Sequence, residues 1–239
     1  QQPETMVAFK NGPPLILGVG RDAMYVASDV QALVPYTKRV VYLDDGEVVR
    51  VKGASYEVFS STGKPLNKKI TEINWTSEVA GKGGFSHFML KEIFEQPRAV
   101  AQALQPHINL ATGRVEMSGV GFDVDSVFKD IDRVLIVACG SSYYTALVGE
   151  YMIERLARVP VECDIASEFR YRHPVIPKNS LLISVSQSGE TADTLAAVRL
   201  AKQAGVRVLS ICNVKSSSID READGHLYMN AGSEVGVAS

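Results

Sequence analysis

Cysteine is scarce in this sequence, and charge of neither sign dominates. The 239 residues include three cysteines, Cys139, Cys163 and Cys212, with no CxxC pair and no Cys/His spacing typical of a metal site. A disulfide-built fold is therefore excluded, and reduced thiols in a cytoplasmic protein without bound metal are indicated. The 25 basic and 27 acidic residues give a net charge of -2, without the basic excess typical of nucleic-acid-binding proteins.

Long apolar runs and common phosphate-binding patterns are also missing. No apolar stretch approaches the roughly 20 residues that cross a bilayer, so we expect neither membrane association nor a signal peptide. Neither GxGxxG nor GxxxxGK followed by Ser or Thr occurs, which argues against dinucleotide-binding and Walker-type sites. The chain starts at Gln1 without a methionine and stops at Ser239 without a tail, so we expect a fragment or a processed product.

Hydrophobic residues, 46% of the total, suffice for a folded core, and in the first third of the chain they form short runs. These runs are Thr5 to Phe9, Leu15 to Val19, Met24 to Ala27, Arg39 to Leu43, Glu47 to Val51 and Ser55 to Phe59. The turn Asp44-Asp45-Gly46 predicts a hairpin between the two runs that flank it. Short runs without long helices between them predict an antiparallel sheet in an α+β N-terminal part.

A polar, glycine-rich passage from about residue 60 to residue 85 is interpreted as a linker or domain boundary. We therefore divide the chain into residues 1–82 and residues 83–239. Beyond the passage, His87 to Ala103 is predicted to be helical, and Pro97 should break or kink that helix. Its expected apolar side consists of Phe88, Ile93, Phe94, Val100 and Leu104.

From about residue 132 the pattern changes to strands and helices in alternation. Strands are predicted at Val134 to Ala138, Val161 to Ile165, Ser180 to Ser186, Val206 to Cys212 and His226 to Met229. The first is a continuous apolar run, typical of a strand buried on both faces. Helices are predicted at Tyr143 to Leu156 and Thr191 to Gln203. The alternation predicts an α/β domain with a parallel sheet flanked by helices.

Two of these strands end in hydroxyl-rich turns, each directly before a helix. The turns are residues 138–142, Ala-Cys-Gly-Ser-Ser, and residues 186–191, Ser-Gln-Ser-Gly-Glu-Thr. Ligands of open α/β sheets bind beyond the carboxyl ends of the strands, and the N–H groups of a helix N-terminus attract phosphate. Gly140 and Gly189 would let the backbone turn sharply. Further hydrogen bonds to an anion would come from Ser142, Ser186, Gln187, Ser188 and Thr191.

Simple helix capping explains either turn alone equally well, because serine and threonine are favoured caps. Two such turns at neighbouring strand ends would face one crevice, which favours a shared anion site. The sequence therefore predicts a phosphate site built from neutral donors.

Other reactive side chains have less specific surroundings. Cys139 could be a nucleophile near a helix N-terminus, but no His lies near it in the sequence, and a packed thiol is the preferred interpretation. His173 is interpreted as part of a solvated helix end, while Glu168 and Arg170 could line a crevice or pair across an interface. Lys215, with the serines after it, is interpreted as a loop before a short helix.

Several segments together resemble one enzyme family. Residues 186–194, SQSGETADT, resemble the phosphate-binding turn of sugar isomerase (SIS) domains, and residues 139–142, CGSS, resemble the first sugar-contacting loop of that fold. Further matching segments are residues 91–97 (KEIFEQP), 166–172 (ASEFRYR), 230–239 (NAGSEVGVAS), 12–15 (GPPL) and 27–29 (ASD). In combination they resemble the glutamine–fructose-6-phosphate aminotransferases (isomerizing), also called glucosamine-6-phosphate synthases.

The resemblance implies an Ntn-type glutaminase domain followed by two SIS domains, which together make glucosamine 6-phosphate from fructose 6-phosphate and glutamine without a cofactor. Residues 1–82 would be the end of the glutaminase domain, and residues 83–239 the first SIS domain. Ser142, Ser186, Gln187, Ser188 and Thr191 would hold the phosphate. Ser141 and the Val237 backbone would contact the sugar, with Cys139, Gly140 and Gly189 nearby.

The same resemblance implies what this chain does not carry. The family's N-terminal cysteine nucleophile is replaced here by Gln1, and the other glutamine-binding residues would lie upstream. The acid–base residues and essential lysine of the sugar site would lie beyond Ser239. We therefore expect no catalytic residues in this chain, inactivity of the isolated piece, and a homodimer formed through SIS domains. Ser141 stands where threonine is familiar in the family, and it keeps the hydroxyl group.

Two other functions remain as alternatives. A SIS domain can be a non-catalytic sugar-phosphate-sensing or sugar-phosphate-binding module, but the antiparallel first third and the absence of a basic helix-turn-helix argue against a regulator. A plain sugar-phosphate isomerase would leave the glutaminase-like strands unexplained.

Overall fold

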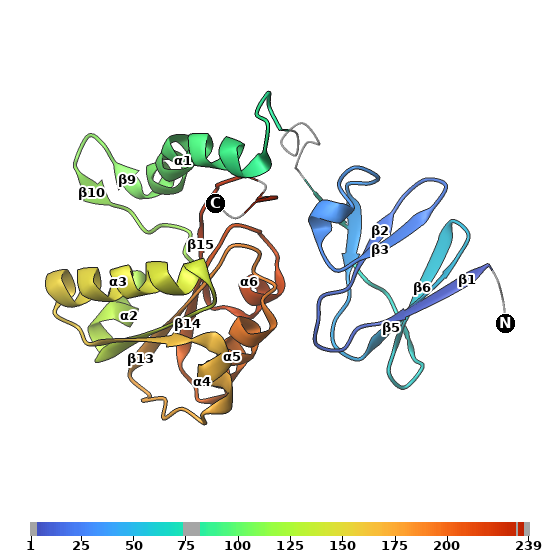
Figure 1. Cartoon of the computed structure of the whole chain (residues 1–239). Helices are drawn as coiled ribbons and strands as arrows, with labels where there is room; N and C mark the ends of the chain where they lie inside the picture. Colours follow the sequence, from blue (N-terminus) through green and yellow to red (C-terminus); the bar gives the residue numbers. More distant parts are fainter. Residues whose placement is uncertain (1–3, 74–81, 233, 237–239) are drawn as a thin grey trace. The chain divides into compact units, whose positions relative to one another are not determined.

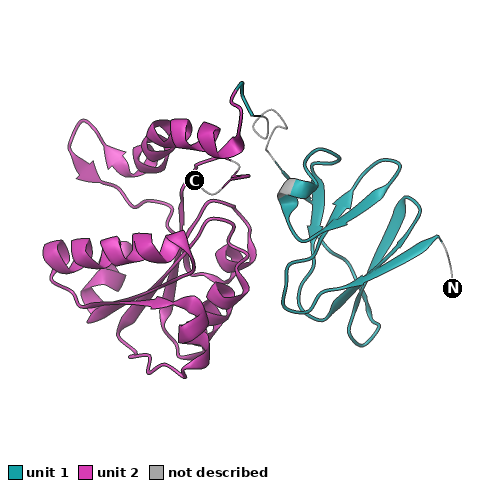
Figure 2. Cartoon of the chain, viewed as in Figure 1, with its two compact units in different colours: residues 1–84 teal, residues 85–239 magenta. Residues whose placement is uncertain are grey.

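The computed structural model describes residues 4–73, 82–232 and 234–236. The chain divides into two compact units, Gln1–Gly84 and Phe85–Ser239 (Figure 2). In the described part of the chain, no helix combines the length and apolarity needed to span a bilayer.

The first unit contains two antiparallel sheets among its described residues, as the sequence predicts (Figure 1). One has the strand order β1 (Thr5–Phe9), β5 (Glu47–Lys52), β6 (Ser55–Ser60) and β7 (Pro65–Leu66). The other has the order β3 (Met24–Ala27), β2 (Ile16–Val19), β4 (Arg39–Tyr42) and β8 (Thr71–Glu72), with a short 3₁₀ helix, η1 (Val30–Ala32). Residues of both sheets, including Leu17, Val41, Val49 and Val58, share one core cluster, so the sheets pack face to face.

The hairpin predicted at Asp44-Asp45-Gly46 is wrong, because β4 and β5 lie in different sheets. The turn connects the two sheets and is held by lysines. Lys10 Nζ lies 2.6 Å from Asp45 Oδ1, and Lys68 Nζ lies 2.6 Å from Asp44 Oδ2. Partial burial alone would lower the pKa of Lys68, but hydrogen bonds to Asp44 and Glu47 outweigh it and raise the pKa. Val41 of β4 and Val49 of β5 belong to one core cluster although their strands lie in different sheets. The apolar pattern of the sequence does not distinguish strands packed against each other across a core from strands paired in one sheet.

The passage interpreted as a linker or domain boundary contains two short strands, β7 and β8, which pair with β6 and β4. The division between the two units, after Gly84, lies at the end of this passage. Pro97, predicted to break or kink the first helix of the second unit, does not break it, since α1 runs from Phe88 to Leu104. Pro97 is exposed, so water can bond to the carbonyl that its missing N–H leaves free.

Helix α1 also buries a different side from the one expected. Ile93, Phe94, Val100 and Leu104 are exposed, whereas Lys91 and Glu92 are buried. After α1 the chain forms the short helix η3 (Gln105–His107) and then a small hairpin of β9 (Ile108–Asn109) and β10 (Arg114–Val115).

The predicted parallel sheet of the second unit is confirmed. Its described strands have the order β12 (Val161–Ile165), β11 (Arg133–Ala138), β13 (Ser180–Ser186), β14 (Arg207–Cys212) and β15 (Gly225–Tyr228). The accompanying helices are α2 (Val124–Asp130), α3 (Ser141–Ala157), α4 (Ala166–Tyr171), α5 (Ala192–Gln203) and α6 (Ser218–Glu222). Helix α6 is the short helix predicted after Lys215, whereas α2 and α4 have no counterpart among the long predicted helices.

The apolar run of β11 covers both faces of the sheet because successive side chains point in opposite directions. Leu135 and Val137 pack in one cluster with residues of α4, α5 and α6. Val134 and Ile136 pack in another with Ala146 of α3. The sheet is therefore enclosed between two layers of helices (Figure 1).

Candidate functional site

The two hydroxyl-rich turns lie side by side. Strands β11 and β13 pair directly and in parallel, with Ala138 opposite Val185, so their carboxyl ends lead into adjacent turns. The connection from β11 leads outward to β12, and the chain then returns to place β13 on the other side of β11. This change of direction is the topological switch point, where open α/β sheets form their ligand crevice.

In the second turn, hydroxyl groups organise the backbone before α5. Ser186 Oγ accepts a hydrogen bond from Gly189 N at 3.0 Å and lies 3.2 Å from Thr191 Oγ1. Ser188 Oγ accepts one from Glu190 N at 3.2 Å. Thr191 occupies the N-cap position of α5 but makes no side-chain cap hydrogen bond. Simple capping therefore does not account for this threonine.

The first turn leaves the N-terminus of α3 equally without a side-chain cap. Gly140 occupies the N-cap position with φ 59 and ψ -134, and Ser141 and Ser142 are the first two helical residues. Ser141 is exposed and Ser142 is half-buried. The N–H groups of the first turn of an α-helix have no intrahelical partners and carry partial positive charge. Helices α3 and α5 thus bring two such ends to one edge of the sheet.

Gly189 is required for two independent reasons. Its φ is +66, which favours glycine, and a Cβ added there would lie 2.0 Å from Ser217 Oγ. Helix α6 approaches the turn this closely because Ile219 N donates to the Gly189 carbonyl at 2.9 Å and Ser218 N donates to Glu190 Oε1 at 3.0 Å. The short helix α6 therefore supports the turn from behind.

Gln187 supplies an unused donor at this place. Its side-chain Nε2 is buried and has no hydrogen-bond partner among the described residues, while its backbone carbonyl accepts a hydrogen bond from Asn213 N at 3.1 Å. A buried donor without a partner is costly, on the order of 1–3 kcal/mol. A ligand acceptor would remove that cost.

Of the other predicted residues, Cys139 behaves as a packed thiol. It packs against the core cluster that contains Leu135 and accepts a hydrogen bond from Thr194 Oγ1 at 3.8 Å. Burial raises the pKa of the two remaining thiols, Cys163 and Cys212, to about 12.

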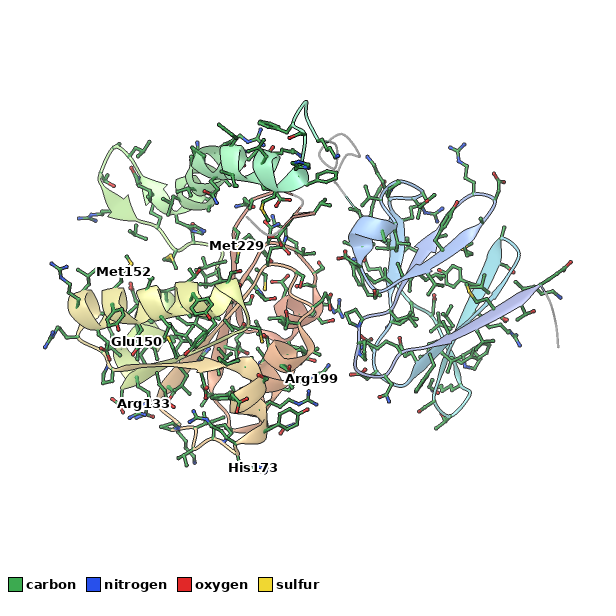
Figure 3. All side chains as sticks on the ribbon, viewed as in Figure 1. Arg133, Glu150, Met152, His173, Arg199 and Met229 are labelled. Atoms are coloured by element: carbon green, nitrogen blue, oxygen red, sulfur yellow. The ribbon has the colours of Figure 1, made fainter. Side chains whose placement is uncertain are left out.

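The remaining predicted residues are exposed, contact side chains outside the two turns, or lie outside the described residues. His173 is exposed on the connection that leads to the amino end of β13 (Figure 3). Arg170 pairs with Asp193 at 3.1 Å, so it ties α4 to α5. Lys215 Nζ lies 4.7 Å from the centre of the Tyr228 ring. Val237 lies outside the described residues.

Sequence reasoning missed Asp220, a buried carboxylate in α6. Its oxygens lie 2.9 Å from His226 Nδ1 and 3.2 Å from Tyr228 OH, and they accept a hydrogen bond from Ser216 N at 2.7 Å. Ser210 approaches the same Nδ1 of His226, so Ser210, His226 and Asp220 do not form a catalytic relay. These contacts tie α6 to the loop before it and to β15 after it, and no motif in the sequence marks them.

Comparison with a family model defines the class of the second unit. Residues 128–239 match the SIS domain, and the switch-point sheet described above lies within that segment. The predicted SIS fold is confirmed.

Over its whole length the chain is similar to particular curated enzymes. It is 46% identical over 239 residues to the glutamine–fructose-6-phosphate aminotransferase (isomerizing) of Chlorobaculum tepidum, and 45% identical over 239 residues to that of Clostridium acetobutylicum. It covers 39% of the length of each relative. The resemblance to this family is thus confirmed across the whole chain.

A solved structure supports the same relationship. The C-terminal domain of glucosamine-fructose-6-phosphate aminotransferase from Francisella tularensis is 42% identical, with a TM-score of 0.62 over 66% of this chain and 44% of that one.

Proposed function

We propose that this chain is part of an enzyme that makes glucosamine 6-phosphate from fructose 6-phosphate and glutamine, and that it carries the sugar-phosphate-binding half. The observation that carries the proposal is the direct pairing of β11 with β13, which joins two uncapped helix N-termini at one switch point. Backbone N–H groups of α3 and α5 would bind the phosphate, together with the side chains of Ser142, Ser186, Gln187, Ser188 and Thr191.

The sugar ring would be contacted by Ser141 and by the Val237 backbone. Ser141 is exposed at the start of α3, in the position that such a contact requires. Neutral donors suffice for an anion at two helix N-termini, so no metal or cofactor is needed for binding.

We assign residues 1–82 to the end of an Ntn-type glutaminase domain of the same cytoplasmic enzyme. The assignment is supported by the alignment with the curated aminotransferases, which extends over 100% of this chain. Because the chain spans 39% of their length, we expect it to bind the hexose phosphate without converting it.

We also propose that two copies associate through the second unit. Helix α3 has a row of exposed apolar side chains at helical spacing: Tyr144, Val148, Tyr151, Met152 and Leu156. Exposed apolar patches of this kind are typical of protein interfaces. Met152 is labelled on α3 in Figure 3.

The test is calorimetric titration of the chain with fructose 6-phosphate. The double variant Ser186→Ala/Thr191→Ala should bind at least about tenfold more weakly, because two hydroxyl groups that reach the anion are lost. The matched control is Ser60→Ala/Thr62→Ala, which removes another hydroxyl pair, 2.8 Å apart, in the first unit. Equal affinity in the wild type and the Ser186/Thr191 variant would refute the phosphate assignment.

A further inference from the structure

The segment that follows β15 is attached to the candidate site by Asn213. This side chain is buried, and its Oδ1 accepts a hydrogen bond from Ala231 N at 2.8 Å. Its Nδ2 donates to the Gly232 carbonyl. The backbone N–H of Asn213 donates to the backbone carbonyl of Gln187 in the second turn. Asn213 therefore links residues 231–232 directly to the turn that is proposed to hold phosphate.

The other end of this segment is attached to α1 by Glu92. Glu92 is 5% exposed, and its Oε1 accepts hydrogen bonds from Val235 N and Gly236 N, both at 2.7 Å. Hydrogen bonds to a charged acceptor are roughly twice as strong as neutral ones, and a buried carboxylate needs them to offset its lost hydration. The buried carboxylate of Glu92 therefore serves to hold the segment that follows β15 against α1.

Close packing at Gly236 supports the same arrangement independently. A Cβ added to Gly236 would lie 2.6 Å from Glu92 Oε2 and 3.1 Å from both the N and Cα atoms of Met89. The backbone of Met89 cannot move aside without displacing the start of α1. The segment therefore reaches α1 only because residue 236 has no side chain.

We infer that Glu92 is a positioning residue for the sugar half of the site, acting through residues 230–232 and 234–236. This inference rests on the proposed function. Glu92 lies outside the segment that matches the SIS domain, residues 128–239, so α1 extends the site beyond the SIS domain itself. Asn213 fixes residues 231–232 and Glu92 fixes residues 235–236, so these described residues form a strap that starts beside the turn at residues 186–191. The turn binds the phosphate group, and the strap places its own backbone against the hexose.

This division of labour predicts a change of selectivity rather than a uniform loss of binding. In Glu92→Ala, affinity for fructose 6-phosphate should fall about tenfold, since two charge-assisted hydrogen bonds to the strap are lost. Affinity for inorganic phosphate should stay within about twofold, since the turn is untouched. Both affinities are measured on the full chain, by calorimetry for the sugar and by NMR titration for phosphate.

Three further variants sharpen the test. Glu92→Gln keeps an oxygen that accepts both N–H groups and should restore most of the affinity for the sugar. Gly236→Ala should reproduce the effect of Glu92→Ala by forcing the strap away from α1. Glu95→Ala, the matched control, removes a carboxylate of the same helix that pairs with Arg98 at 2.9 Å, and it should bind both ligands as the wild type does.

The inference fails if Glu92→Ala and Gly236→Ala bind fructose 6-phosphate as tightly as the wild type. It also fails if both ligands weaken equally, because that result indicates general damage to the fold. Amide hydrogen exchange of Val235 and Gly236 in the free chain tests the attachment itself. Should the wild type bind neither ligand, the proposed function fails, while faster exchange in Glu92→Ala than in Glu95→Ala still supports the strap.

Discussion

The turn at residues 44–46 in the first unit and the turn at residues 186–191 in the second are both polar and contain glycine, but they use their polar groups differently. In the first turn, Asp44 and Asp45 are paired with Lys68 and Lys10. In the second, Gln187 Nε2 is buried without a partner among the described residues, and α5 begins without a side-chain cap. A turn whose polar groups satisfy one another holds strands in place, whereas a turn that leaves donors unused can bind a ligand.

The largest expected effect separates two glycines of the candidate site. Gly189→Ala places a Cβ against Ser217, in addition to straining a positive φ, and should lower the free energy of unfolding by about 3 kcal/mol. Gly140→Ala also strains a positive φ, but no atom lies within 4 Å of its Cβ, so a smaller loss of about 1–2 kcal/mol is expected. Urea unfolding of the second unit measures both. Equal losses would show that α6 does not support the turn as tightly as its contacts indicate.

A smaller effect should test the turn of the first unit. Lys10 is 4% exposed and Asp45 is 35% exposed, so Lys10→Ala leaves a partly hydrated carboxylate and should cost about 2 kcal/mol. Arg50→Ala, which removes an exposed pair with Glu57, should cost less than about 1 kcal/mol. Thermal unfolding of the first unit gives both values. Neither variant should alter binding of fructose 6-phosphate, and a changed affinity would contradict the separation of roles between the two turns.

The smallest effect concerns Cys163 and Cys212, two thiols of the parallel sheet. With a pKa of about 12, Cys163 and Cys212 should react little with iodoacetamide at pH 8, and denaturant should make both reactive. Because the pKa values are raised from 9.0 on folding, these thiols stabilise the folded chain below pH 9, and this contribution is lost as the pH rises towards 12. Mass spectrometry of tryptic peptides follows the labelling. Rapid labelling of native Cys212 would show that the core around it is open.

The sequence predicts the second unit better than the first because its strands carry their own evidence. A continuous apolar run such as Val134 to Ala138 fits a strand enclosed between helices. The strands β11 and β13 are each followed by a long helix that the sequence predicts, α3 and α5. In the first unit, a short apolar run fits equally well a strand that pairs with the next strand in one sheet and a strand that packs against it from the other sheet. That ambiguity produced the wrong hairpin between β4 and β5.

The candidate site divides in the same way. The two turns are predictable because a strand, a glycine, hydroxyl groups and a helix follow one another along the chain. Glu92 and Asn213 are not, because their hydrogen bonds join segments far apart in sequence, and Glu92 sits in a helix whose apolar side chains suggested another buried face. Asp220 has partners close in sequence, but no motif marks a carboxylate of a short helix as buried.

The pairing of β11 with β13 also has a consequence for folding. Between these two strands the chain must first complete α3, β12 and α4, and the contact between Asp132 and Asn179 spans 47 positions. Closing so long a loop is slow compared with forming a helix or a hairpin. The two turns therefore meet only when the central sheet is complete, so a ligand that needs both turns would favour fully folded molecules and could not guide the early stages of folding.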